Sequence, residues 1–188
     1  MVAVFAYNCV NSMLSELVMT DNKVTNILMV GVGGQGTLLA SEILSEVLMQ
    51  AGYDVKKAEV HGMAQRGGTV LSTLKVGDFA APLIRTGQAD VALLLWDANL
   101  AVHRSLLKDG GALLVNSDKD GEGNRVDGSG IARKMGNAVL SNLVLLGLAV
   151  SKNALFCSEQ ECVVAIQKLA PAKFVEQNLQ AFHTGMKI

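Results

Sequence analysis

The chain has 188 residues, of which 50% are hydrophobic, 4% aromatic and 18% charged, and its formal net charge is −1. This length and apolar content suit the buried core of one domain, and a charge near zero without basic runs gives no indication of nucleic-acid binding. Ser141, Asn142 and Gly147 interrupt the longest apolar candidate, residues 138–150, so we expect a buried helix there and no membrane span.

Residues 1–22 precede the first predicted strand. Residues 2–10 are apolar, but they lack the positively charged start and the small-residue cleavage pattern of a secretory signal. We interpret residues 1–22 as a tail or an over-extended start, with a partner-binding helix as the alternative. Residues 23–188 are then predicted to form one α/β domain.

A strand, a glycine turn and an amphipathic helix are predicted for residues 24–50. Residues 24–30 are mostly apolar and lead into Gly31, which is typical of a buried parallel strand that ends in a tight turn. In residues 37–50 the apolar side chains recur at helical spacing. This segment is therefore predicted to be the first half of a βαβ unit.

The turn itself fits the pattern G-x-G-x-x-G. Such a turn leaves backbone N–H groups free at a helix N-terminus, and its glycines let a phosphate approach the backbone. We expect cofactor binding by its residues Gly31, Gly33, Gly34, Gln35 and Gly36. The first alternative is that the glycines only permit a tight turn and close packing. The second is a free-standing dinucleotide-binding oxidoreductase that uses Glu59 as its ribose-binding acid.

A second glycine-rich segment, residues 61–68, separates two predicted strands at residues 53–60 and 69–76. At the carboxyl edge of an open α/β sheet this loop would lie beside the first turn. Arginine binds phosphates and carboxylates, and histidine titrates near neutral pH. The candidate catalytic residues are therefore His61, Gln65 and Arg66, and Gly67 and Gly68 are added to the cofactor-binding set. The alternative is that Arg66 pairs with Glu59 and His61 caps a carbonyl group.

The second half of the chain predicts another βαβ unit and C-terminal helices. After a turn at Thr86-Gly87 we expect a strand at 90–95, a helix at 98–107, a strand at 112–115 and a hairpin or loop at 116–130. Asp97 either caps the helix that follows or lines the cleft. The fold class is accordingly a three-layer α/β/α Rossmann-like open sheet, mostly parallel, with C-terminal helices.

The last thirty residues predict two helices separated by Pro171. Ser158 and Glu161 have the spacing of a capping box at the start of the first. The apolar stripes of both helices indicate core packing. His103 is interpreted as a surface or packing residue, and His183 has no partner that the sequence reveals.

Together, the segments Gly31-Val32-Gly33-Gly34-Gln35-Gly36 and His61-Gly62-Met63-Ala64-Gln65-Arg66-Gly67-Gly68 resemble the γ subunit of 2-oxoacid:ferredoxin oxidoreductases. The form H-G-M-x-Q-R-G-G is similar to the indolepyruvate branch, whereas other branches more often carry Y-G-P-E-x-R-G. The resemblance covers roughly residues 26–185. It implies a small γ-type subunit acting on indolepyruvate or other aryl pyruvates, with the pyruvate, 2-oxoglutarate or 2-ketoisovalerate branch as the alternative.

The resemblance also implies the chemistry and the partners. Thiamine diphosphate with Mg attacks the 2-oxoacid, carbon dioxide leaves, electrons pass through [4Fe-4S] clusters to ferredoxin, and coenzyme A takes the acyl group. The cofactors are implied on a large catalytic subunit, with no cofactor bound tightly by this chain alone, no metal site, and a cytoplasmic hetero-oligomer without nucleic acid or membrane. A purely structural docking module is the remaining alternative.

Two features of the sequence support the placement of the cofactors on a partner subunit. A [4Fe–4S] cluster needs four thiolates, and the chain has only Cys9, Cys157 and Cys162, which also suit a reducing compartment. Thiamine diphosphate sites usually show G-D-G followed by an asparagine pair, because these groups hold the magnesium. Asp120-Gly121 and Asp127-Gly128 lack that context and are interpreted as turns.

Overall fold

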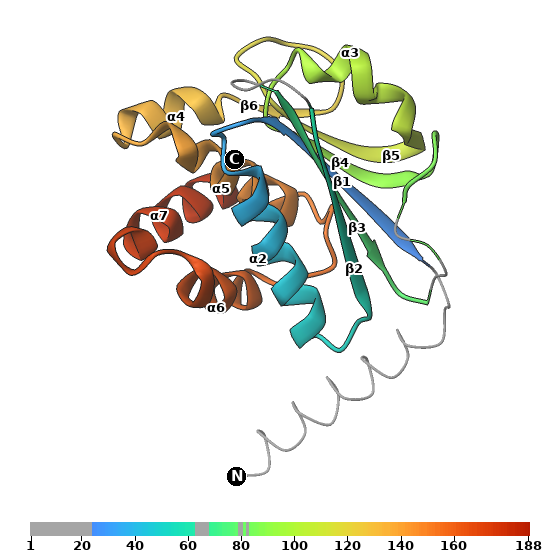
Figure 1. The fold of residues 1–188 in the computed structure, drawn as a ribbon. Helices are drawn as coiled ribbons and strands as arrows, with labels where there is room; N and C mark the ends of the chain where they lie inside the picture. Colours follow the sequence, from blue (N-terminus) through green and yellow to red (C-terminus); the bar gives the residue numbers. More distant parts are fainter. Residues whose placement is uncertain (1–23, 63–67, 79–80, 82) are drawn as a thin grey trace.

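The computed structural model describes residues 24–62, 68–78, 81 and 83–188. Its centre is a six-stranded sheet with the strand order β2-β3-β1-β4-β5-β6 (Figure 1). The strands are β1 (Thr25–Val32), β2 (Val55–His61), β3 (Thr69–Val76), β4 (Ala89–Leu94), β5 (Leu107–Asn116) and β6 (Asn124–Val126). The boundary between a tail at 1–22 and a domain at 23–188 stays a prediction, since residues 1–23 lie outside the described part.

The sheet is mixed, and its parallel part contains the ends of β1, β4 and β5. β1 pairs in parallel with β4, β4 with β5, and β5 with β6. β3 runs antiparallel to both β1 and β2 and lies between them. The carboxyl ends of β1, β4 and β5 therefore meet at one edge, where ligands bind in open α/β sheets.

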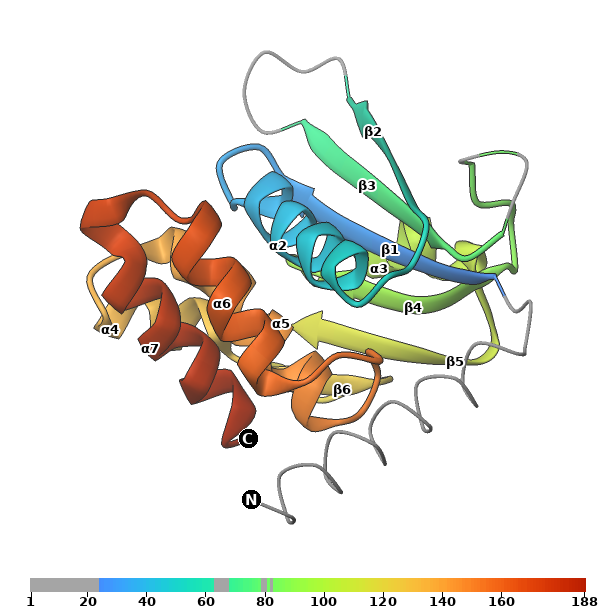
Figure 2. The ribbon, with the colours of Figure 1, turned by 90° about the horizontal axis from the view of Figure 1, so that it is seen from below.

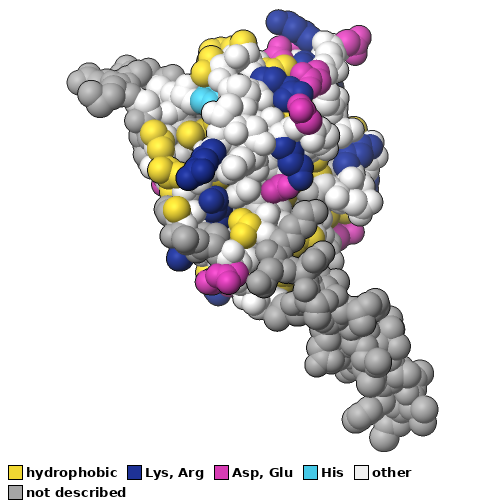
Figure 3. Space-filling model, turned by 90° about the vertical axis from the view of Figure 1, so that its right-hand side faces the viewer, with side chains coloured by type: hydrophobic (Ala, Val, Ile, Leu, Met, Phe, Trp, Pro, Cys, Tyr) yellow, Lys and Arg dark blue, Asp and Glu magenta, His cyan; other side chains and the backbone are white. Residues whose placement is uncertain are grey.

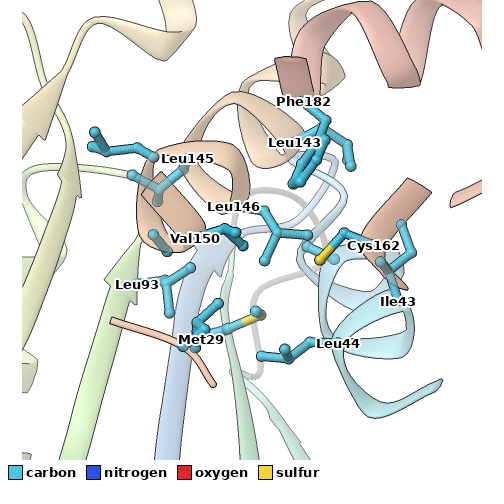
Figure 4. Packing of buried hydrophobic residues seen from close by; sticks show 14 of the residues in the cluster. Met29, Ile43, Leu44, Leu93, Leu143, Leu145, Leu146, Val150, Cys162 and Phe182 are labelled. Carbon is cyan, nitrogen blue, oxygen red and sulfur yellow. The ribbon is translucent and has the colours of Figure 1, made fainter. Parts of the chain in front are cut away.

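One face of the sheet is covered by a thick helical layer (Figures 1 and 2). Leu and Val side chains of α5 pack with those of α2, α6 and α7 against β1 and β4, as the close view of Met29, Leu93 and Leu146 shows (Figure 4). The layer consists of α2 (Thr37–Gln50), α4 (Gly128–Lys134), α5 (Ser141–Ser151), α6 (Glu159–Leu169), α7 (Val175–Met186) and the 3₁₀ turns at Ala138–Leu140 and Ala172–Phe174.

The opposite face has a much thinner cover. A smaller apolar cluster includes Leu28 and Val30 of β1, and it packs with Leu100 and Leu106. The cover consists of α3 (Asn99–His103) and the 3₁₀ turn Arg104–Leu106. Figure 3 views the molecule from this side and shows basic and acidic side chains among exposed apolar ones.

Two glycines let α5 and α7 approach backbone to backbone. A Cβ atom at Gly147 would overlap the carbonyl oxygen of Phe182 and lie 3.0 Å from the nitrogen of Met186. A Cβ atom at Gly185 would overlap the carbonyl oxygen of Val144. Because α5 is buried along nearly its whole length, this crossing is central to the helical layer.

The structure confirms most of the predicted elements. The α/β class, the strand at 69–76, the helix at 37–50 and the capping box at Ser158 all agree with the sequence prediction. The predicted loop at 116–130 is partly wrong, because it contains β6, which pairs in parallel with β5, and the first turn of α4. The helix predicted at 98–107 is shorter, since β5 already begins at Leu107.

The histidines also need one correction. The sequence reveals no partner for His183, but in the structure its Nδ1 atom lies 2.9 Å from Oε1 of Glu159, so α7 and α6 are linked at their surface. His103 is half-buried, and this burial lowers its pKa. Across the ranges that the structure describes, none of the helices is long and apolar enough for a membrane span.

Candidate functional site

The turn between β1 and α2 requires glycine at two positions. Gly34 and Gly36 have φ values of 95° and 71°, in the left-handed region that residues with a Cβ atom rarely adopt. A Cβ atom at Gly36 would also lie 2.5 Å from Nδ2 of Asn142 and 2.8 Å from Cγ1 of Val139. Around Gly34, by contrast, no described atom comes within 4 Å of the position of a Cβ atom.

The helix that follows begins without a side-chain cap. Gly36 is the N-cap of α2, so no side chain there accepts a hydrogen bond from the first turn. The first backbone N–H groups of any α-helix lack intrahelical acceptors. Gly33 and Gly34 are exposed beside them. The turn therefore offers backbone donors and a positive helix dipole to an anion.

The side chain of Gln35 stabilises this turn through two hydrogen bonds. Its Oε1 atom accepts a hydrogen bond from the backbone N–H of Val32 at 2.7 Å, and its Nε2 atom donates to the carbonyl of Leu95 at 3.1 Å. One side chain thus ties the end of β1 to the end of β4. Binding of a cofactor by Gln35 stays a prediction, and the structure adds this internal role.

Two asparagines that the sequence analysis did not single out support the same edge. Asn142, at the start of α5, donates from Nδ2 to the carbonyl of Gly36 at 2.8 Å. Asn116, at the end of β5, donates to the carbonyl of Leu95 at 3.0 Å and exchanges hydrogen bonds with Ser129 at the start of α4. A polar residue inside an apolar run, such as Asn142, was the available signal.

The two glycine-rich segments meet in space. The backbone N–H of Gly33 donates to the carbonyl of Gly68 at 3.0 Å, and that of Gly62 donates to the carbonyl of Thr69 at 2.8 Å. Gly68, at one end of the second segment, is therefore fixed beside the first turn as predicted, whereas Gly62 at the other end is tied to the start of β3. Gln65, Arg66, Gly67 and the side chain of His61 lie outside the described residues, so their roles stay predictions.

Asp97 is held in an ion pair. Its Oδ1 atom lies 3.0 Å from Nη1 of Arg125, which also donates to the carbonyl of Lys119. The N-cap of α3 is Ala98, with no capping side chain, so the predicted capping role of Asp97 is wrong. The pair links the end of β4 to the loop that carries β6.

Exposed apolar side chains surround the glycine turn. Leu38 in the first turn of α2 is 39% exposed, Val139 beside Gly36 is 38% exposed, and Trp96 after β4 is 50% exposed. We call Leu38, Val139 and Trp96 the apolar rim. Large apolar side chains around exposed backbone donors are typical of a surface that a partner covers.

The position of Glu59 does not fit the ribose-binding acid of a dinucleotide-binding protein. Glu59 lies on β2, which β3 separates from β1, whereas a ribose-binding acid belongs on a strand adjacent to the glycine turn. Its Oε1 atom is 2.8 Å from Nζ of Lys57 in the same strand. The pairing of Glu59 with Lys57 gives that carboxylate a structural role.

A shallow groove along α2 carries no comparable donors. It has a volume of about 410 Å³ and is lined by residues of α2, β2 and α6, among them Glu42, Glu46 and Lys57. Lys57 faces Glu42 at 3.7 Å, and a hydrogen bond from Lys168 lowers the pKa of Glu46. These charges are paired with one another.

The comparisons with known proteins agree with the geometry. Residues 26–188 match the profile of the family described as pyruvate ferredoxin/flavodoxin oxidoreductase. A relative from Archaeoglobus fulgidus, indolepyruvate oxidoreductase subunit IorB, is 33% identical over 85% of this chain and 92% of its own length.

Solved structures share the fold. The γ subunit of a keto/oxoacid ferredoxin oxidoreductase from Geobacter sulfurreducens superimposes with a TM-score of 0.71 at 29% identity, covering 87% of this chain and 96% of the other. A 2-oxoglutarate:ferredoxin oxidoreductase from Magnetococcus marinus, solved with 2-oxoglutarate, coenzyme A and succinyl-CoA bound, gives a TM-score of 0.74 at 18% identity. The match covers 89% of this chain but 31% of that longer one.

Proposed function

Because the chain belongs to the pyruvate ferredoxin/flavodoxin oxidoreductase family, as a small subunit of a 2-oxoacid:ferredoxin oxidoreductase, we propose that it acts with a larger catalytic subunit on indolepyruvate or another aryl pyruvate. The products are the acyl-CoA, carbon dioxide and reduced ferredoxin. The H-G-M-x-Q-R-G-G segment and the similarity to an indolepyruvate oxidoreductase subunit support this substrate class. Its cysteine content supports a cytoplasmic location.

The redox cofactors belong to the partner in this proposal. Bound thiamine diphosphate supplies the nucleophilic carbon and the electron sink for decarboxylation. The residues of this chain do not fit that cofactor, because Asp120-Gly121 and Asp127-Gly128 lack the leading glycine of a G-D-G motif. They do not fit a four-thiolate cluster either, because the chain has only three cysteines. Within the described ranges no three His, Cys, Asp or Glu residues converge as metal ligands.

The contact between the two glycine segments, Gly33 N–H to Gly68 carbonyl, is the observation that carries the role of this chain. It holds Gly68, one end of the loop that contains Arg66, beside the turn that leads into the uncapped N-terminus of α2. We assign the turn to a phosphate of coenzyme A or to the partner's backbone, and Arg66, Gln65 and His61 to orienting a carboxylate or diphosphate.

The apolar rim completes the proposed interface. Leu38, Val139 and Trp96 expose apolar surface around the turn, and burying that surface against the catalytic subunit stabilises the complex. It also removes water from the space in front of the turn, which strengthens electrostatic interactions with a substrate anion. This chain thus closes and orients a site whose reacting groups belong to the partner.

Co-purification tests the subunit assignment. The chain is tagged in its native host and purified gently, and the masses and the visible absorption of the product are recorded. We expect a larger partner with brown iron–sulfur absorbance, and turnover of indolepyruvate with coenzyme A that exceeds turnover of pyruvate and 2-oxoglutarate. Isolation of a colourless chain that binds NAD(H) would overturn the assignment in favour of a dinucleotide-binding protein.

Substitution of Arg66 tests the role of the second segment. Arg66→Ala is expected to lower kcat/KM of the intact complex at least tenfold, and Arg66→Lys is expected to recover part of it, because lysine keeps the charge but loses the bidentate geometry. Arg85→Ala, at an exposed position in the turn that precedes β4, is the matched control and leaves turnover unchanged. Full activity of an assembled Arg66→Ala complex would support a purely structural docking module.

A further inference from the structure

Two cysteines lie side by side at the start of α6. The Sγ atoms of Cys157 and Cys162 are 3.7 Å apart. Cys157 precedes the N-cap Ser158, and Cys162 lies four residues beyond it, so the pair takes the two positions of a hydrophobic staple. Any two apolar side chains would serve for that packing. Two thiols there also permit covalent chemistry.

The local structure fixes the distance between the two thiols. Ser158 and Glu161 form both hydrogen bonds of a capping box: the N–H of Ser158 donates to Glu161 at 2.7 Å, and the N–H of Glu161 donates to the hydroxyl of Ser158 at 3.3 Å. The turn that joins the two cysteines is therefore closed on itself. The contact between the sulfur atoms follows from this turn.

The two thiols differ in exposure. Cys157 is partly exposed, whereas Cys162 is fully buried and lies close to Ile43 and Leu146 in the core (Figure 4). The hydrogen bond between the two thiols, together with burial, raises the pKa of Cys162. Because the thiolate is the reactive form of cysteine and access is needed, oxidation begins at Cys157.

We propose that Cys157 and Cys162 form a reversible disulfide when the protein meets a hydroperoxide. The Cys157 thiolate attacks one peroxide oxygen, the O–O bond breaks, and Cys157 becomes a sulfenic acid as hydroxide or alkoxide leaves. The Cys162 sulfur then attacks the Cys157 sulfur, the S–O bond breaks, and water leaves with the Cys162 proton. Two thiols are thus oxidised by two electrons, and the peroxide accepts them.

The geometry requires only a local movement. A disulfide has an S–S length of about 2.05 Å, so the sulfur atoms must approach by roughly 1.6 Å. Cys157 is only partly buried, at the edge of the core, so rotation of its side chain can bring its sulfur closer while the buried Cys162 keeps its place. The ring of the preceding Phe156 packs against Tyr53 with centroids 5.1 Å apart, just after the C-terminal end of α2. The pair therefore lies at the opposite end of α2 from the glycine turn, and the inference is independent of the proposed function.

Peptide mapping tests this inference on the full chain. The purified protein is treated with hydrogen peroxide, blocked with iodoacetamide and digested with trypsin without reduction. Both cysteines lie in the peptide 153–168, which has no internal Lys or Arg. We expect this peptide to be two hydrogens lighter and free of alkyl groups, and to regain both alkylation sites after dithiothreitol. Cys157→Ser removes the product, and Cys9→Ser is the matched control that keeps it.

A second readout follows the stability of the oxidised chain. The disulfide is expected to raise the melting temperature by about 5 °C, and Cys157→Ser to show no rise. Peptide 153–168 that stays doubly alkylated after peroxide, or that carries a sulfinic acid at Cys157 beside a free Cys162, would overturn the inference. A disulfide that joins Cys9 to either residue would do the same.

Discussion

Glycines occupy two regions of this protein for opposite reasons. At the turn between β1 and α2, Gly34 faces open space and has a left-handed backbone. At the crossing of α5 and α7, Gly147 and Gly185 have no left-handed backbone, but each lies against the backbone of the other helix. The turn needs glycine for its conformation and for access from outside, whereas the crossing needs it for the absence of a side chain.

Substitutions in the two regions should therefore have different effects. The crossing is buried in the core, so an added methyl group has no free space and must displace a helix. The turn is held by polar contacts from Gln35 and Asn142, and its outer side is exposed. We therefore expect changes at the crossing to act on folding and changes on the outer side of the turn to act on the complex.

Gly147→Ala is expected to have the largest effect on stability. The new methyl group would overlap the carbonyl oxygen of Phe182, and we expect a loss of about 3 kcal/mol in the free energy of unfolding, measured by urea denaturation. Gln177→Ala, on an exposed position of α7, is the control and should change stability by no more than about 0.5 kcal/mol. A loss below about 1 kcal/mol for Gly147→Ala would contradict this prediction, because it would mean that α5 and α7 can move apart at little cost.

The same contrast shows how far the sequence could predict this structure. The strand at 69–76 and the helix at 37–50 were predictable because side-chain periodicity and turn residues are local signals. The position of β3 between β1 and β2 was not predictable in this way, because strand order depends on pairing between distant segments.

The site was predictable to a similar extent. The glycine pattern indicated the turn, and the spacing of the strands predicted the second segment beside it. The hydrogen bond between Gly33 and Gly68 confirms this for Gly68, and the placement of residues 63–67 stays a prediction. The bond from Asn142 to Gly36 spans 106 residues, so no local pattern contains it. Gly147 was noted only as an interruption of an apolar run, because its partner helix is invisible in sequence.

Gly36→Ala is expected to lower stability less than Gly147→Ala. Backbone strain and crowding by neighbouring atoms both contribute to this loss. The left-handed backbone costs an alanine about 1 kcal/mol, and its Cβ atom would lie 2.5 Å from Nδ2 of Asn142. We expect a total loss of about 2 kcal/mol. In an Asn142→Ala background the loss due to Gly36→Ala should become smaller but stay above about 1 kcal/mol, because the strain and the contact with Cγ1 of Val139 at 2.8 Å remain, and a double-mutant cycle measures the difference. Equal losses in both backgrounds would exclude crowding by Asn142.

Gln35→Ala tests whether polar bracing holds the turn. The substitution removes the hydrogen bonds to Val32 and Leu95, and we expect a loss of about 1.5 kcal/mol, because the carbonyl of Leu95 keeps its bond from Asn116. Gln50→Ala, at the exposed end of the same helix, is the matched control with a change within about 0.5 kcal/mol. Unchanged thermal stability of Gln35→Ala would assign the side chain to ligand binding alone.

Gly34→Ala is expected to have the smallest effect on folding and to separate conformation from access. Gly34 and Gly52 both have left-handed backbones, with φ of 95° and 88°, and no described atom within 4 Å of a Cβ position, but they lie beyond opposite ends of α2. Each alanine variant should therefore lose about 1 kcal/mol of stability.

The two variants should differ in the assembled enzyme. Gly34 lies just before the uncapped helix N-terminus, and no described atom comes within 4 Å of a methyl group there. Because we place a phosphate or the partner's backbone at this turn, the Gly34→Ala complex should bind its partner or coenzyme A at least tenfold more weakly. Gly52→Ala should assemble and turn over normally, because its methyl group lies at the far end of α2. Titration of each variant into the catalytic subunit measures this directly. Equal behaviour of the two would place the partner and the substrate away from the glycine turn, and the turn would then serve the fold alone.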